Sequence, residues 1–148
     1  MATLCVTAGV ADALARACDR AFPLEACGFL LAAAQHGRPI ATEIVITVGS
    51  AGYRDEFEIP DHELRRMGAY AEDRGLQIVA LFHSHPSGDP RLSATDRAAL
   101  RYSAWPWVIV TRPNATSAIA LTAYAPADAT HIGVGVDGSG WRGGTGFG

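Results

Sequence analysis

Lysine is absent from this chain of 148 residues, and all twelve basic residues are arginine. No side-chain ammonium is therefore present to receive an isopeptide-linked tag. The formal net charge of −3 gives no electrostatic reason to expect a nucleic acid or an anionic membrane as a partner. Because the arginines accompany many alanine and glycine residues, the composition is typical of a protein from a bacterium with a GC-rich genome.

Cysteine and long apolar runs are also scarce. Cys5, Cys18 and Cys27 are odd in number and irregularly spaced, which argues against a disulfide framework. No run approaches the roughly 18 consecutive apolar residues that a membrane-spanning helix needs. The first residues lack the basic head and apolar core of a signal peptide. Together these absences predict a cytoplasmic protein without a membrane partner.

The overall balance of residues is that of a globular protein, with 49% hydrophobic and 18% charged residues. A single domain of this length can bury a substantial core. Glycine is concentrated at the C-terminal end, which predicts a flexible tail there. We therefore expect one domain at residues 1–136 and a glycine-rich tail at residues 137–148.

Hydrophobic periodicity predicts three helices and about six strands. Val10 and Leu14 recur at helical spacing before Pro23, and Asp61 is a good N-cap for a second helix that ends near Gly75. The uneven alternation of these elements favours an α/β fold, with a single-domain mixed β-sheet flanked by helices. Segments with strand character are 3–7, 25–33, 39–48, 57–59, 78–85, 107–111 and 118–124, and the helices are 7–22, 61–75 and one beginning at 93.

The segment 83–96 carries the strongest chemical signal in the chain. It follows the apolar run 78–82, which predicts a buried strand. Alternate side chains of a strand share a face, so His83 and His85 are expected on one side, about 6.6 Å apart along the backbone. Together with Asp96 they would supply three ligands and leave a position for water, as in catalytic zinc sites.

Each half of this pattern also has an ordinary structural explanation. Two histidines near a strand end are often only polar residues. Ser93 and Asp96 form a capping box, in which a hydroxyl and a carboxylate satisfy N–H groups at the start of a helix. The two histidines and the capping box together are much less expected by chance than either one alone. The two roles are also compatible, because an aspartate held in the first turn of a helix stays ionised, as a ligand must.

The sequence His-Ser-His, then seven residues, then Ser-x-x-Asp closely resembles the signature of the JAMM (MPN-plus) metalloproteases. That signature also includes a glutamate far upstream, and Glu25 matches it. The resemblance covers about residues 8–125 and implies the MPN/JAMM fold, with layering like that of the cytidine deaminases. It implies a zinc metalloprotease with one Zn²⁺ per chain, metal ligands at His83, His85 and Asp96, Glu25 as the catalytic proton shuttle and Ser93 as the catalytic oxyanion donor.

Alternative interpretations remain open for these residues. Glu25 could be a strand-end glutamate that reaches water, and Cys27 on the same strand face could be a fourth ligand or a small core residue. Two histidines and one carboxylate also suit a non-haem iron site. A different class is a non-catalytic MPN scaffold that binds partners, although such relatives lose ligands that this chain keeps.

The resemblance also implies a class of substrate. It predicts hydrolysis of an amide or isopeptide bond at the glycine-ended C-terminus of a ubiquitin-like or sulfur-carrier protein. The loop at residues 49–57 is short, as in compact bacterial members of the family. An extended Gly-Gly could add as a strand to a sheet edge, and we expect that edge at Phe57 and Ile59.

Overall fold

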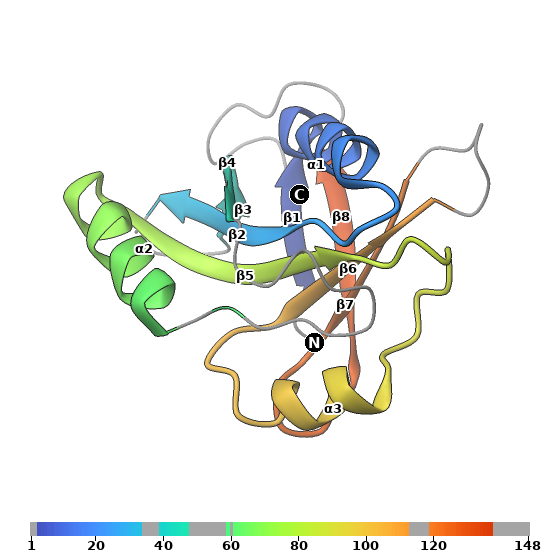
Figure 1. The fold of residues 1–148 in the computed structure, drawn as a ribbon. Helices are drawn as coiled ribbons and strands as arrows, with labels where there is room; N and C mark the ends of the chain where they lie inside the picture. Colours follow the sequence, from blue (N-terminus) through green and yellow to red (C-terminus); the bar gives the residue numbers. More distant parts are fainter. Residues whose placement is uncertain (1–2, 34–38, 48–58, 60, 113–118, 138–148) are drawn as a thin grey trace.

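The computed structural model describes residues 3–33, 39–47, 59, 61–112 and 119–137. In this described part, eight strands form a mixed sheet and three helices pack against it (Figure 1). The predicted α/β fold with a mixed sheet is therefore confirmed. The strands are β1 Thr3–Thr7, β2 Cys27–Ala33, β3 Ile40–Ala41, β4 Glu43–Thr47, β5 Leu76–Ser84, β6 Trp107–Thr111, β7 Ala120–Tyr124 and β8 His131–Asp137, and the helices are α1 Ala8–Ala21, α2 Asp61–Asp73 and α3 Ala94–Leu100.

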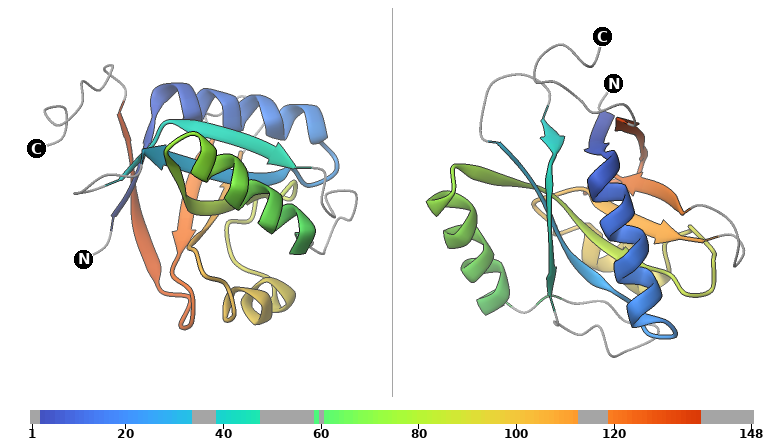
Figure 2. Two further views of the ribbon diagram at one scale, coloured as in Figure 1. Left: turned by 90° about the vertical axis from the view of Figure 1, so that its left-hand side faces the viewer. Right: turned by 90° about the horizontal axis from the view of Figure 1, so that it is seen from above.

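The sheet has the strand order β3-β1-β8-β7-β6-β5-β2-β4. Strand β5 lies parallel to β6 and antiparallel to β2. The two edge strands, β3 and β4, are consecutive in the sequence and only Thr42 separates them. A sheet whose opposite edges are joined by one residue must curl strongly. Figures 1 and 2 show the result, with β1 and β8 running across β2 and β5.

Helix α1 covers one face of the curled sheet. Its buried residues Val10 and Leu14 belong to a core cluster that also contains Val6, Leu30 and Phe82 from the strands. Thr7 caps the helix, because its side-chain oxygen accepts a hydrogen bond from Val10 N at 3.1 Å. The predicted first helix is thus confirmed.

Helices α2 and α3 pack on the opposite face of the sheet, as Figure 2 shows. Met67 of α2 and Leu100 of α3 share a second core cluster with Phe29, Leu81 and Ile109. Neighbouring strand residues such as Phe29 and Leu30 therefore enter different clusters, as the alternation of side chains in a strand requires. The central strands are buried on both faces, which holds the end of β5 rigidly.

Three sequence predictions need correction. The strand predicted at 25–33 begins at Cys27, so Glu25 precedes it. The strand predicted at 39–48 divides into β3 and β4 at Thr42, because its first part pairs with β1 and its second with β2. Strand β8 was not predicted, since its alternating glycines (His131-Ile-Gly-Val-Gly-Val-Asp137) give a weak strand signal.

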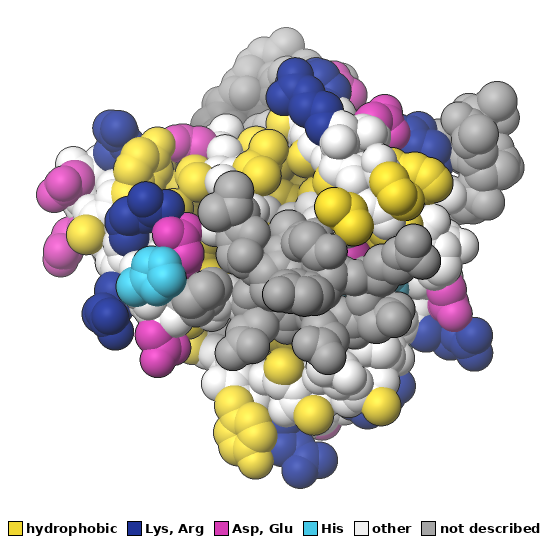
Figure 3. Space-filling view, viewed as in Figure 1, with side chains coloured by type: hydrophobic (Ala, Val, Ile, Leu, Met, Phe, Trp, Pro, Cys, Tyr) yellow, Lys and Arg dark blue, Asp and Glu magenta, His cyan; other side chains and the backbone are white. Residues whose placement is uncertain are grey.

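Two further predictions concern the C-terminal tail and the absence of a membrane-spanning helix. Strand β8 extends to Asp137, and residues 138–148 lie outside the described residues, so the division into domain and tail stays a prediction. None of the described helices is long and apolar enough to cross a membrane. On the described part of the face in Figure 3, basic and acidic side chains are interspersed.

Candidate metal centre

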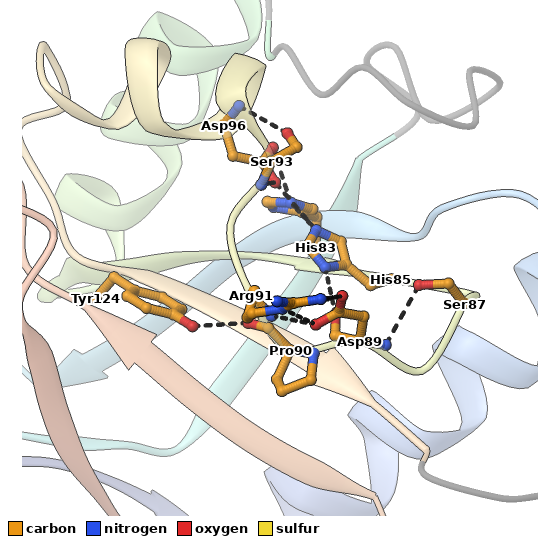
Figure 4. Close-up of polar contacts among 9 residues, drawn as sticks. All are labelled: His83, His85, Ser87, Asp89, Pro90, Arg91, Ser93, Asp96 and Tyr124. Carbon is orange, nitrogen blue, oxygen red and sulfur yellow. Dashed lines mark hydrogen bonds and ion pairs between the residues drawn. The ribbon is translucent and has the colours of Figure 1, made fainter.

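His83, His85 and Asp96 converge where β5 ends and α3 begins (Figure 4). The Nε2 atoms of the two histidines are 3.2 Å apart. Asp96 places Oδ1 3.3 Å from His83 Nε2 and Oδ2 3.1 Å from His85 Nε2. The structure therefore brings together the three residues that the sequence singled out as ligands.

His83 is fixed by the central strands. It lies in β5, opposite Cys27 of β2 on one side and Ile109 of β6 on the other. Its side chain is fully buried, and the ring of Trp107 meets it edge-on with centroids 5.4 Å apart. Packing from three strands therefore leaves the imidazole little freedom to leave the site.

His85 lies just beyond the end of β5 and is held by two hydrogen bonds. Its backbone N–H donates to Val110 O at 3.0 Å, which continues the alignment with β6. Its ring Nδ1 lies 2.8 Å from the carbonyl oxygen of Asp89. A carbonyl can only accept, so Nδ1 carries the proton and Nε2 is left to bind a metal.

Asp96 is held by the predicted capping box. Ser93 Oγ accepts from Asp96 N at 2.9 Å, and Asp96 Oδ2 accepts from Ser93 N at 3.1 Å. The same carboxylate faces both histidines, so in one position it caps the helix and is available as a metal ligand. The predicted capping box is confirmed, and it orients the carboxylate toward the histidines.

The electrostatics of the cluster favour an ionised carboxylate. Burial opposes ionisation of Asp96, but hydrogen bonds from His83 and His85 outweigh it and hold the pKa well below the usual range. Burial lowers the pKa of His83. Burial also lowers the pKa of His85, but the hydrogen bonds of His85 to Asp96 and to the Asp89 carbonyl outweigh this effect and raise its pKa overall. A metal ion at Nε2 would take the place of that proton.

The spacing of the three ligands fits a small divalent ion. Ligands about 2.0–2.1 Å from a tetrahedral zinc ion lie about 3.3 Å from one another. The two histidine Nε2 atoms are 3.2 Å apart, and each lies 3.1–3.3 Å from a different oxygen of Asp96, so the three side chains are close enough to share one ion. Two imidazoles and one carboxylate are also a donor set that zinc accepts, with a fourth position for water. The donor set and the closeness of its members therefore suit such an ion.

Glu25 lies beside this cluster and is 5% exposed. It lines a cleft of about 700 Å³ together with His85, Ser93 and Asp96. Ser84 anchors the segment that follows Glu25, because Ser84 Oγ accepts from Ala26 N at 2.8 Å and Ser84 N donates to Ala26 O at 2.9 Å. These two hydrogen bonds give Ser84 a structural role beside the cluster.

Three other residues were considered from the sequence, and the structure places two of them, Cys27 and Ile59, outside the cluster. Cys27 is fully buried, and its thiol donates to Thr47 O at 3.7 Å. Burial and the neighbouring Glu25 raise the pKa of Cys27 to about 12, so it is a neutral core thiol. Phe57 lies outside the described residues. Ile59 is in no strand and is buried in the second core cluster, so the edge strand expected at this residue is not observed.

Several residues around the cleft were missed in the sequence. The sequence did not single out Asp89, whose carbonyl holds His85 and whose carboxylate pairs with Arg91. Tyr124 donates to Pro90 O at 2.7 Å and so supports the same loop. Contacts to backbone carbonyls leave no pattern in a sequence, although an Asp-Pro step such as 89–90 is typical of a turn.

Comparison with known proteins places the chain in a family. Residues 7–124 match the sequence profile of Prok-JAB, described as prokaryotic homologs of the JAB domain. The chain belongs to this family, and the predicted resemblance to JAMM proteins is confirmed.

Individual relatives agree with that assignment. The chain is 32% identical to the Desampylase of Haloferax volcanii over 84 residues, and this matched region makes up 57% of the chain. The matched region spans 58% of that relative's length. The fold is similar to a JAB1/MPN domain protein from Archaeoglobus fulgidus, with a TM-score of 0.60, 16% identity and 92% and 99% of the two chains covered. The fold is also similar to a structure described as a JAMM metalloprotease-like zinc site in the proteasome and signalosome. The TM-score is 0.55 and the identity 16%, and 90% of this chain and 97% of that chain are covered.

Proposed function

We propose that this protein is a zinc-dependent hydrolase that cleaves an amide or isopeptide bond at the glycine-ended C-terminus of a ubiquitin-like or sulfur-carrier protein. The observation that carries the proposal is the convergence of His83, His85 and Asp96 at a cleft that Glu25 lines together with His85 and Asp96. A purely structural cap would not need two imidazoles aimed at the carboxylate of Asp96.

The metal ligands would be His83, His85 and Asp96, with one Zn²⁺ per chain. Zinc held there would supply Lewis-acid polarisation of the scissile carbonyl and lower the pKa of a water at the site. The choice of zinc over iron is supported by the solved neighbour described as a metalloprotease-like zinc site.

Glu25 would act as the catalytic proton shuttle. It would accept a proton from the attacking water and give it to the leaving amine. Its place in the cleft with His85 supports this role, and the anchoring of Ala26 by Ser84 would hold the carboxylate in position.

Ser93 would donate a hydrogen bond to the carbonyl oxygen as negative charge develops there. Its Oγ already accepts from Asp96 N, which orients the hydroxyl and leaves its proton for an outside acceptor. A single donor of this type contributes about 3 kcal/mol to the transition state. The exposure of Ser93 at the cleft supports contact with a substrate.

The substrate class rests on the comparisons more than on the geometry. The name Desampylase denotes an enzyme that takes a modifier off its substrate, which supports a small protein modifier as the acyl half of the substrate here. Binding of an extended Gly-Gly beside Phe57 and Ile59 remains a proposal. The burial of Ile59 limits that residue to an indirect role in shaping the groove.

The test is cleavage of defined conjugates. Ubiquitin-like and sulfur-carrier proteins ending in Gly-Gly are joined to an amine through an amide or an isopeptide bond, and the products are followed by mass spectrometry. We expect cleavage directly after the terminal glycine, loss of cleavage with a zinc chelator and recovery with added Zn²⁺. Absence of cleavage by the zinc-loaded protein on every conjugate would reject the function.

A further inference from the structure

Arg97 occupies a distinctive place in the cleft. It lies one residue after Asp96 in α3 and lines the same cleft as Glu25 and Ser93. Its backbone N–H donates to Ser93 O at 2.9 Å, so its main chain is fixed to the capping residue. Its side chain is exposed to the solvent that fills the cleft.

The other arginine that lines the cleft, Arg91, already pairs with a carboxylate. Arg91 makes side-chain hydrogen bonds of 2.9–3.2 Å to both carboxylate oxygens of Asp89. Among the residues that the structure describes, the guanidinium of Arg97 contacts no carboxylate. Arg97 therefore offers a cation that no partner within the described chain neutralises.

A substrate segment that enters this cleft meets an uneven distribution of charge. The carboxylate of Asp96 faces His83 and His85, and that of Asp89 faces Arg91. Within the described part of the chain no group accepts a hydrogen bond from the guanidinium of Arg97, so its N–H donors can serve an outside group. A guanidinium binds a carboxylate through two parallel hydrogen bonds, which gives both strength and direction.

We infer that Arg97 is a specificity-determining residue that binds a carboxylate of the substrate segment lying in the cleft. This inference rests on the proposed function and adds a chemical requirement to it: substrates with an acid close to the scissile bond are preferred over neutral ones. The carboxylate can come from an acidic side chain or from the free α-carboxylate of a short leaving group.

The experiment uses four substrates that share a modifier ending in Gly-Gly. The neutral substrate has alanine amide as its leaving group. In the second the leaving group is alanine with a free carboxylate, and in the third it is aspartate amide. The fourth has alanine amide as its leaving group and a glutamate just before Gly-Gly. Each is tested with the zinc-loaded wild type, Arg97→Gln, Arg97→Lys and Arg101→Gln. Arg101 is the matched control, because it is exposed just after the end of the same helix but does not line the cleft. Binding to the Glu25→Gln variant, with and without Arg97→Gln, is measured in parallel.

We expect Arg97→Gln to raise KM about tenfold for at least one acidic substrate and to leave kcat and the neutral substrate unchanged, since charge-assisted hydrogen bonds are worth about that factor. Arg97→Lys should recover part of the loss, and Arg101→Gln should have no effect. The acidic substrate that responds identifies the source of the carboxylate.

The outcomes separate the inference from the function on which it rests. Equal KM values for wild type and Arg97→Gln on all four substrates would overturn the inference and leave the hydrolase intact. If the wild type cleaves nothing but binds an acidic substrate in an Arg97-dependent way, the hydrolase is rejected and the recognition stands. Absence of Arg97-dependent binding and cleavage together would overturn the inference.

Discussion

His85 is the residue on which the geometry of the metal centre depends most. Its ring connects the loop carbonyl of Asp89 to the carboxylate of Asp96 through its two nitrogens. Only this orientation presents Nε2 to the position shared with His83. The imidazole therefore links the loop after β5 to the start of α3 while it presents Nε2 as a proposed metal ligand.

Replacement of His85 with alanine should abolish stoichiometric zinc binding. Two remaining ligands leave the ion mostly hydrated, so affinity should fall by orders of magnitude. Zinc per chain is measured by elemental mass spectrometry after equilibration at low micromolar free metal. The control is His62→Ala, because His62 lies exposed on α2, away from the centre. Full zinc retention by His85→Ala would refute the ligand assignment.

Ser84 should matter for both stability and the position of Glu25. Its substitution with alanine leaves the N–H of Ala26 without its side-chain acceptor in a buried position, which costs about 1–3 kcal/mol of unfolding free energy. We also expect kcat to fall while zinc content stays at one per chain. Chemical denaturation and metal analysis measure these effects. Normal stability together with normal kcat would show that the bond to Ala26 has no supporting role.

At the scale of elements, the packing of β2 between β4 and β5 aligns the strand that follows Glu25. Gly28 lies opposite Ile46 of β4 and Phe82 of β5. A Cβ atom at Gly28 would collide with the carbonyl oxygen of Val45 and would lie 2.7 Å from the ring of Phe82. The close approach of these strands therefore requires glycine.

Gly28→Ala should destabilise the protein by about 1–3 kcal/mol or more, because backbone atoms must move to admit the methyl group. Gly68→Ala is the matched control, since no atom lies within 4 Å of its added Cβ in the middle of α2. That control should stabilise the protein by about 0.5–1 kcal/mol through helix propensity. Urea unfolding measures both. Equal stabilities of Gly28→Ala and the wild type would contradict the described strand packing.

The elements around the site were those best predicted from the sequence. The alternation that places His83 and His85 together and the capping box at Ser93 are local patterns, and local patterns persist in the fold. The division at Thr42 was not predictable, because it depends on two different partner strands. Strand β8 was missed for a similar reason: Gly133 and Gly135 weaken its signal, and pairing with β1 and β7 forms it.

At the scale of the molecule, the curled sheet brings together groups that are remote in sequence. Glu25 and His83 belong to neighbouring segments because β2 pairs with β5. Asp96 reaches them through the short helix that crosses between β5 and β6. The signature spacing indicated which residues matter, but only the pairing of the strands explains why they meet.

The absence of lysine makes alkaline stability a simple test of the core. Burial raises the pKa of Cys27 to about 12 and that of Cys18 to about 11, from 9.0. Because the folded state keeps these protons longer, their contribution to stability is complete below pH 9 and is lost as pH rises from 9 toward 12. The unfolding free energy should therefore decline above pH 9, less steeply in Cys27→Ala. A flat profile from pH 8 to 11 would contradict the burial of these thiols.

The central claim is that one carboxylate moves protons beside a metal held by three other residues. Glu25→Gln keeps the size of the side chain but cannot accept a proton at neutral pH. Zinc content and catalytic rate are therefore measured on the same Glu25→Gln preparation, with Glu72→Gln on the exposed face of α2 as the control.

The account predicts one zinc per chain in Glu25→Gln, an unchanged melting temperature and a kcat at least about a hundredfold lower, the usual range of general acid–base contributions. Glu72→Gln should match the wild type. Release of zinc from Glu25→Gln would show that Glu25 is itself a ligand, and an unchanged kcat would show that another group moves the proton. Either result would contradict the account.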